Sequence, residues 1–237
     1  RSTLFPYTTL FRSPYSSTPN GNQNVQIPSG WNNTTRLPTG PGARQSAPFA
    51  ILDTIRRAVE FLSDPLMVPV VATFPVLNVD WSETKLAGQT FYASGGGTPF
   101  SLDNRFISLS GEAGVDIDEF DQHTIAHEFG HYIEDRFSRS DSVGGPHGAG
   151  DILDPRVAFG EGFGYAFAAM VLNDPLVRDA VGALQNSEGR FSVETDDTTG
   201  AEGWFSEASN EEILWAIWRS EERSVGKEYR SQWSPYH

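Results

Sequence analysis

One short motif constrains this chain more than any other feature. Residues 127–131 read His-Glu-Phe-Gly-His, the H-E-x-x-H pattern in which two histidines bind a catalytic zinc ion and the glutamate activates water. In a helix, His127 and His131 lie one turn apart on the same face, so both imidazoles can reach one ion beside Glu128. Residues 125–133 carry no other charge, which indicates a helix packed inside the protein. The alternative is a core helix with two hydrogen-bonded histidines.

A catalytic zinc ion usually takes three protein ligands, so a third ligand is needed. The metzincin pattern would place a histidine six residues after His131, but Phe137 stands there. Glu161 is the best candidate, because it opens an apolar, glycine-rich helix in which an unpaired carboxylate is costly to bury. The flanking glycines would let this helix approach the first one closely. A surface glutamate at a helix start is the alternative. Three rival ligands lie in the intervening loop: His147, Asp151 and Asp154.

Several further polar residues surround these candidates. His123 lies one turn before His127, and we expect it to pack or to support a ligand, since three ligands at successive helical turns converge poorly on a tetrahedral ion. Asp151 or Asp154 could accept the remaining N–H of a ligand histidine. Three aspartates precede the motif and suit a helix start, as caps or first-turn anions: Asp116, Asp118 and Asp121.

Composition narrows the function classes. The 17 Lys and Arg against 31 Asp and Glu give a formal net charge of −14, which argues against nucleic acid or an anionic membrane as partner. The chain has no cysteine, which excludes thiolate ligands, disulfides and cysteine nucleophiles. Apolar runs are too short for a membrane-spanning segment. Nothing in the sequence indicates an oligomeric state.

The chain divides into four parts. Residues 1–13 and 219–237 resemble translated sequencing adapter, and we expect them to be assembly artefacts. Residues 14–46 are rich in Pro, Gly, Ser, Thr and Asn and predict an irregular arm. The remaining residues, 47–218, predict one truncated domain.

Hydrophobic spacing and turn residues predict strands followed by helices, as in an α+β fold. The predicted helices are residues 47–63, 119–137, 159–172, 174–184 and a last one from 209. The predicted strands are residues 77–81, 90–93 and 105–109. Residues 187–203 are predicted to be loop.

These motifs resemble the gluzincins, zinc metallopeptidases that share the H-E-x-x-H helix and take a glutamate ligand from a later helix. Residues 121–139 and 157–173 are also similar to uncharacterised, exported bacterial proteins with the motifs HEFGHY and GEGFG or GEGWG. Thermolysin-like gluzincins often place an aspartate four residues after the ligand glutamate, where this chain has Tyr165.

The resemblance implies a zincin-like α+β domain over residues 47–218, with a small mixed or antiparallel sheet packed on the active-site helix and further helices C-terminal. It also implies Zn²⁺ as cofactor and a peptide or protein as substrate. It implies that His127, His131 and Glu161 bind zinc and that Glu128 is the general base. It also implies an extracellular or cell-envelope location, with the signal peptide absent from this fragment.

The same resemblance implies that the strand at residues 105–109 is a sheet edge that pairs with the substrate backbone. It implies a residue that stabilises the oxyanion, for which Tyr165 and His147 are candidates. The alternatives to an endopeptidase are a catalytically inactive zinc-binding scaffold or adhesion module, or an inactive truncated fragment. The presence of Glu128 favours the peptidase, since a structural zinc site needs only ligands.

Overall fold

In this computed structural model, the described residues are 27–63, 74–86, 88, 90–95, 105–148, 150–185, 187–195, 200 and 202–232. For residues 184, 187, 188 and 221–232 the description covers the backbone alone. The predicted adapter-like segment at residues 1–13 and the first part of the predicted arm, residues 14–26, lie outside this description.

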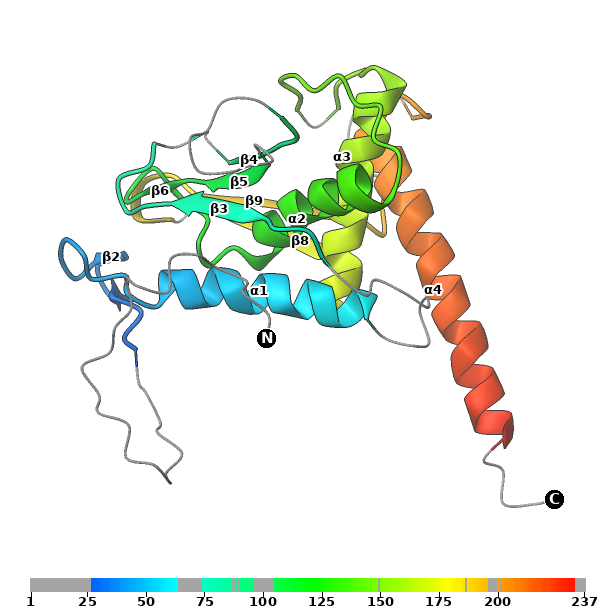
Figure 1. The fold of residues 1–237 in the computed structure, drawn as a ribbon, viewed down its shortest axis with the longest axis horizontal. Helices are drawn as coiled ribbons and strands as arrows, with labels where there is room; N and C mark the ends of the chain where they lie inside the picture. The colour runs from blue at the N-terminus through cyan, green and yellow to red at the C-terminus, as the bar shows by residue number, and fades with distance from the viewer. Residues whose placement is uncertain are drawn as a thin grey trace.

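The described part of the chain has the predicted α+β architecture (Figure 1). Its helices are α1 (Ala47–Leu62), α2 (Gln122–Phe137), α3 (Pro155–Leu172), the short 3-10 turn η1 (Ala183–Gln185) and α4 (Glu207–Gln232). One sheet has the order β3–β5–β4, with strands β3 (Asn78–Trp81), β4 (Phe91–Ala93) and β5 (Phe106–Leu109). A second sheet has the order β6–β7–β8–β9, with strands β6 (Gly111–Glu112), β7 (Asp116–Ile117), β8 (Leu176–Val181) and β9 (Ser187–Ser192). Strands β1 (Trp31–Asn32) and β2 (Leu37–Pro38) pair antiparallel.

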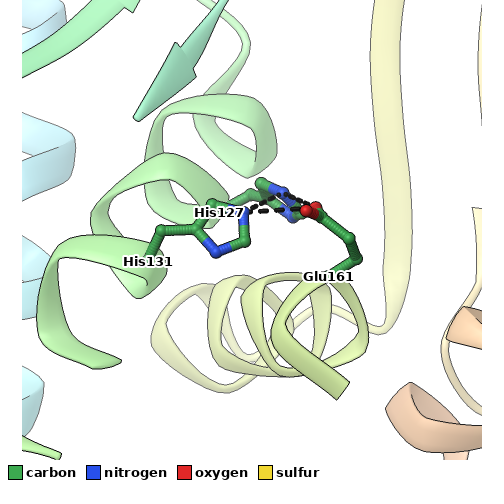
Figure 2. A group of neighbouring side chains, drawn as sticks. All are labelled: His127, His131 and Glu161. Atoms are coloured by element: carbon green, nitrogen blue, oxygen red, sulfur yellow. Dashed lines mark hydrogen bonds and ion pairs between the residues drawn. The ribbon is translucent and has the colours of Figure 1, made fainter. Parts of the chain in front are cut away.

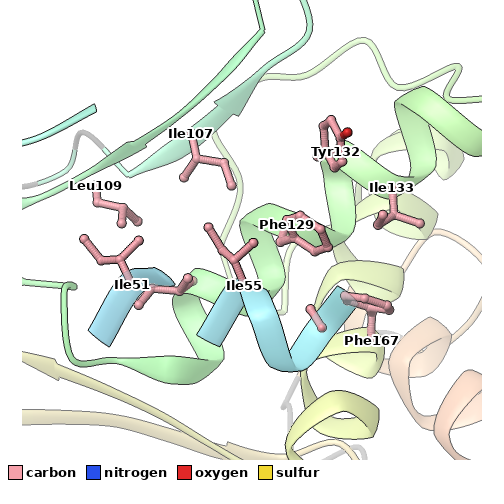
Figure 3. Packing of buried hydrophobic residues seen from close by; sticks show 10 residues of the cluster. Ile51, Ile55, Ile107, Leu109, Phe129, Tyr132, Ile133 and Phe167 are labelled. Carbon is pink, nitrogen blue, oxygen red and sulfur yellow. The ribbon is translucent and has the colours of Figure 1, made fainter. Parts of the chain in front are cut away.

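The main core lies between α1, α2 and the first sheet. Ile51 and Ile55 occur one helical turn apart in α1 and face β5, where Ile107 and Leu109 are fully buried (Figure 3). Phe129 of α2 fills the space beside them, as Figure 3 also shows. The hydrophobic spacing therefore predicted α1 correctly, because a one-sided helix must bury its apolar stripe against another layer.

Helix α2 carries the H-E-x-x-H motif and is buried along most of its length. Asp121 is its N-cap residue, but its carboxylate accepts a hydrogen bond from the backbone N–H of Ala180 at 3.0 Å, not from the helix. Asp116 lies in β7, and Asp118 accepts a hydrogen bond from the Thr90 hydroxyl. Asp121 thus holds the predicted N-cap position without a side-chain capping bond, whereas Asp116 and Asp118 lie before the helix start; tertiary partners compete for these side chains.

Helix α3 begins at Pro155, four residues before the predicted start at 159. Asp154 caps it by accepting a hydrogen bond from the backbone N–H of Arg156 at 3.0 Å. The helix ends where Asn173 adopts a left-handed conformation with φ 50°. It is apolar on all sides because it packs against α1, α2 and α4.

The predicted helix at residues 174–184 is wrong. Residues 176–181 form β8, which pairs antiparallel with β9 inside the predicted loop at 187–203. Asp174-Pro175 has the composition of a helix start, but Val177 alternates with exposed Arg178 and lies opposite Phe191 of β9. Cross-strand packing of this kind outweighs local helix preference.

The buried side chain of Arg44 attaches the end of the predicted arm to the domain. Arg44 is 2 % exposed. Its guanidinium pairs with the buried Glu119 carboxylate and donates to the carbonyl oxygens of Gly111 and Glu83. At the other end of the domain, α4 runs through the predicted boundary at residue 218. Both artefact segments remain predictions. Among the described residues, no helix combines the length and apolar character needed to cross a membrane.

Candidate metal centre

Helices α2 and α3 bring the three predicted ligands together at one point (Figure 2). The Nε2 atoms of His127 and His131 lie 3.0 Å apart. Each also lies 3.2 Å from Oε2 of Glu161, although this carboxylate is 30 or more residues away along the chain. The two nitrogen atoms and the oxygen atom that can bind a metal thus lie close enough together to bind a single ion.

This arrangement fits a tetrahedral divalent ion. Two donors bound at about 2.0–2.1 Å with tetrahedral angles lie about 3.3 Å apart, close to the separations observed here. Two imidazoles and one carboxylate form a common catalytic zinc donor set, which leaves one coordination position for water or substrate. His127, His131 and Glu161 are the residues that could hold this ion.

Close approach of the two helices places the ligands. A Cβ atom at Gly164 of α3 would lie 2.7 Å from Nδ1 of His127, and one at Gly130 of α2 would lie 3.2 Å from the Gly164 Cα. The Tyr165 ring lies against the same imidazole, with 4.1 Å between ring centroids. Among the described residues, Nδ1 of His127 has no hydrogen-bond partner. Packing against Gly164 and Tyr165 therefore orients this ring.

The three predicted ligands shift one another's pKa values strongly, because their charges lie close together. Burial alone raises the pKa of Glu161, but hydrogen bonds and charge from His127 and His131 outweigh it and hold the pKa well below its usual range. Burial lowers the pKa of His131, yet the Glu161 hydrogen bond and the charges of Glu128 and Glu161 raise it to about 9. The site therefore attracts positive charge, whether a proton or a metal ion.

Glu128 lies beside the ligands and is only 7 % exposed. Burial raises its pKa, while the charges of His127 and His131 and a hydrogen bond from the Tyr92 backbone N–H act in the opposite direction. This hydrogen bond joins the carboxylate to β4. A carboxylate with a raised pKa is suited to accept and return a proton near neutral pH.

A cleft of about 660 Å³ opens onto the three ligands and Glu128. One wall is β4, which contributes Phe91 and Tyr92 and stands at the edge of its sheet. The lining also includes Val177 and Phe191 of the β8–β9 hairpin. The prediction that residues 105–109 form the edge strand is wrong, because β5 lies between β3 and β4.

The two predicted oxyanion candidates both line this cleft. Nε2 of His147 lies 3.3 Å from Oε2 of Glu161, so the loop histidine contacts one of the three predicted metal ligands. Tyr165 lies between His127 and Phe191, with ring centroids 4.1 Å and 4.9 Å away. Burial, followed by the charges of Glu207 and Glu128, raises the pKa of Tyr165 well above its usual value.

The other residues predicted to bind the metal or to support its ligands lie away from the three predicted ligands or bond to other groups. Nε2 of His123 lies 3.1 Å from the carbonyl oxygen of Asp174, as expected for a packing residue. The Asp154 side chain caps α3 and forms an ion pair with Arg156 at 2.9 Å. Asp151 is exposed. Neither aspartate is the partner predicted for a ligand imidazole.

A second group of carboxylates, Asp116, Asp118 and Asp179, lies next to the cleft lining, with oxygens within 4.8 Å of one another. Burial raises the pKa of Asp118 to about 8 despite a hydrogen bond from Thr90, and nearby aspartates add to the shift. Burial and the charge of Asp116 raise the pKa of Asp179 to about 6. Asp118 therefore retains its proton at neutral pH, whereas Asp179 is mostly ionised.

Sequence reasoning missed the contributions of Tyr92 and of the β8–β9 hairpin to the cleft. The alternation of Val177 with exposed Arg178 was the available signal for the hairpin. No sequence signal identifies a backbone N–H as the partner of Glu128. Comparisons with known proteins found no matching family model, no matching curated protein and no matching solved structure.

Proposed function

We propose that this protein is a zinc-dependent endopeptidase with a zincin-like, gluzincin-type active site. The observation that carries the proposal is the convergence of His127, His131 and Glu161 on one point, with Glu128 beside them in an open cleft. A purely structural metal site needs neither a neighbouring carboxylate nor an accessible cleft. Peptides and proteins are the proposed substrates.

The bound ion would polarise the scissile carbonyl and lower the pKa of a water molecule toward neutrality. Glu128 takes a proton from this water as it attacks the carbonyl carbon, and then delivers the proton to the leaving amine. The burial of Glu128 supports this role, because burial raises the pKa of its carboxyl group. The hydrogen bond from the Tyr92 backbone N–H holds the carboxylate in position.

The substrate backbone is proposed to lie along β4. Only one edge of β4 pairs with β5, and Phe91 and Tyr92 line the cleft. An extended peptide can add to such an edge through main-chain hydrogen bonds, which suits a wide range of sequences. Tyr165 and His147 are the candidates for stabilising the oxyanion, since both line the cleft.

The test compares the zinc-loaded full chain with Glu128→Gln on casein and on a quenched-fluorescence peptide library. We expect cleavage that chelation abolishes and added zinc restores. Glu128→Gln should lower kcat/KM by about 10²–10⁴-fold, because the general base is lost, while zinc affinity stays within about threefold.

Glu134→Gln is the matched control, because Glu134 is another buried glutamate of α2 outside the ligand set, and its activity should stay within a few-fold of the unsubstituted protein. Tight zinc binding with no cleavage of any substrate would favour the inactive scaffold or adhesion module. Cleavage that survives both chelation and Glu128→Gln would exclude the proposed mechanism.

A further inference from the structure

One face of the β8–β9 hairpin forms part of the cleft lining. Val177 of β8 lies opposite Phe191 of β9. The next pair on the same face is Asp179 opposite Gly189, because residues two apart on a strand point to the same side. All four residues line the cleft. The hairpin therefore presents an apolar patch to the cleft with a carboxylate beside it.

This face of the hairpin is connected to the metal centre through one aromatic ring. The Tyr165 ring lies 4.9 Å from the Phe191 ring and 4.1 Å from the His127 ring, measured between ring centroids. Asp179 is two residues beyond Val177, or about 7 Å along β8. A long substrate side chain that starts near the metal centre can therefore cross Phe191 and reach the Asp179 carboxylate.

The carboxylate of Asp179 lacks a cationic partner in the part of the chain that the structure describes. Its Oδ1 atom is buried and has no hydrogen-bond partner among those residues. Burial, and next the charge of Asp116, raises the pKa of Asp179 to about 6, so the group is mostly ionised at neutral pH. A partly buried, ionised carboxylate without a partner is costly, and a cation supplied by a ligand removes that cost.

Gly189 leaves the other oxygen of this carboxylate open to the cleft. A Cβ atom at Gly189 would lie 3.6 Å from Cβ and 4.0 Å from Oδ2 of Asp179. Any side chain at position 189 would therefore lie against the carboxylate and cover it. The glycine itself is exposed, so a substrate group can occupy this space.

The other charged groups of the cleft do not offer an alternative cation site. Glu161 is a predicted metal ligand, and Glu128 is the proposed base. Asp135 also lines the cleft, but its Oδ2 accepts hydrogen bonds from Nε of Arg105 at 2.6 Å and from the Tyr92 hydroxyl at 2.8 Å. Among the described residues, the cleft lining includes no lysine or arginine. Asp179 is thus the carboxylate that remains available to a substrate.

We propose that Asp179 determines specificity, so that the peptidase prefers substrates with Lys or Arg close to the scissile bond. The substrate ammonium or guanidinium group donates to the Asp179 carboxylate beside Gly189. Its methylene stem packs on Val177 and Phe191. This inference rests on the proposed peptidase and names the substrate class of the same site.

The experiment measures charge selectivity with paired peptides. A quenched-fluorescence library first identifies the position at which Lys or Arg is enriched. Peptides with Arg or its neutral isostere citrulline at that position are then compared on the zinc-loaded full chain. We expect kcat/KM to be about 10–100-fold higher for the Arg peptide, because the charged group gains a charge-assisted hydrogen bond. In Asp179→Asn the ratio should fall to about one, with citrulline cleavage within about threefold of the unsubstituted protein.

Two further variants separate charge recognition from folding. Gly189→Val keeps the carboxylate but covers it, and its Cβ makes only ordinary contacts in a strand that suits a β-branched residue. It should also lower the preference for Arg. Asp135→Asn is the matched control, since this cleft carboxylate is already paired with Arg105, and the Arg to citrulline ratio should not change. Thermal unfolding verifies that each variant folds.

An Arg to citrulline ratio near one, or a ratio that survives Asp179→Asn, would overturn the inference while cleavage itself leaves the proposed peptidase intact. Without any cleavage, the proposed function fails, and fluorescence anisotropy of labelled Ala-Ala-Arg-Ala-Ala and its citrulline analogue on Glu128→Gln decides the inference. Tighter binding of the Arg peptide that Asp179→Asn removes would support it, and equal binding would overturn it. Calorimetric binding of Ca²⁺ that Asp179→Asn abolishes would also overturn it, because the three carboxylates of Asp116, Asp118 and Asp179 would then hold an ion instead.

Discussion

The contact between Gly164 and His127 makes a single added methyl group a sharp test of the metal centre. In Gly164→Ala, the new Cβ would lie 2.7 Å from Nδ1, 2.8 Å from Cε1 and 3.1 Å from Cγ of His127. Ordinary contact begins at 3.4 Å, so the ring must retreat by about 0.7 Å. Metal–ligand distances tolerate only about ±0.2 Å, so the displaced imidazole can no longer bind in the same geometry.

The expected cost is therefore larger for metal binding than for folding. Misplacing one ligand should weaken zinc affinity by about 10–100-fold, equivalent to about 1.4–2.8 kcal/mol. The metal-free protein should lose up to about 2.5 kcal/mol, because overpacking of about 1–3 kcal/mol is partly offset by about 0.5–1 kcal/mol of helix preference. Zinc affinity is measured by competition with a chromophoric chelator, and stability by denaturant unfolding in EDTA.

Two glycines of the same helix provide matched controls. A Cβ at Gly160 would meet the flexible end of Glu134 at 3.3 Å, so Gly160→Ala should leave zinc affinity unchanged and stability equal or higher. A Cβ at Gly162 would lie 2.7 Å from Cβ of Asn210 in α4, so Gly162→Ala should lower stability without pressing on a ligand ring. Zinc affinity of Gly164→Ala within about threefold of the unsubstituted protein would refute the close packing of α3 on the ligand.

Four further outcomes follow from the charged groups. Zinc binding at pH 7.5 should release about one proton, because His131, with a pKa of about 9, must become neutral to bind the ion. Calorimetry in two buffers of different ionisation enthalpy measures the number of protons released. Zero release would contradict the prediction. In the zinc-free protein, the stability from the His131 proton is fully present below about pH 6.5 and is lost as pH rises through about 9. Burial raises the pKa of Asp118 from 3.8 to about 8, so the stability linked to its proton is fully present only below pH 3.8 and is lost as pH rises from there to about 8. Asp118→Asn should therefore raise the Tm at both pH 5 and pH 9, and by clearly more at pH 9. Arg44→Ala should lower the free energy of unfolding by about 3–5 kcal/mol, because Glu119 would be left buried without its partner; a loss below about 1 kcal/mol in urea unfolding would show that the pair is not an anchor.

Local sequence patterns were sufficient to predict those helices that bury one face. The apolar spacing of α1 and the uncharged run around the H-E-x-x-H motif predicted these helices to within a few residues. The motif also implied that His127 and His131 share a face, because helical geometry alone sets that relation. Glu161 could be proposed as a partner since a buried carboxylate requires a compensating charge.

Structure decided everything that depends on contacts between distant segments. The predicted helix at residues 174–184 is a strand because Val177 and Phe191 pair across a hairpin, which no local preference encodes. The edge position belongs to β4 and not β5, because strand order is a property of the whole sheet. The approach of His147 to Glu161 likewise depends on the path of an exposed loop.

By itself, the sequence determined the chemistry available to this protein: two imidazoles one helical turn apart, a carboxylate beside them, and an acidic chain without thiols. Only the tertiary structure decided that a carboxylate 30 residues away meets them within 3.2 Å and that an edge strand and a hairpin form a cleft there. The physical reason is that helical periodicity is fixed by neighbouring residues, whereas the meeting of two helices depends on which side chains, here glycines, allow them to come close.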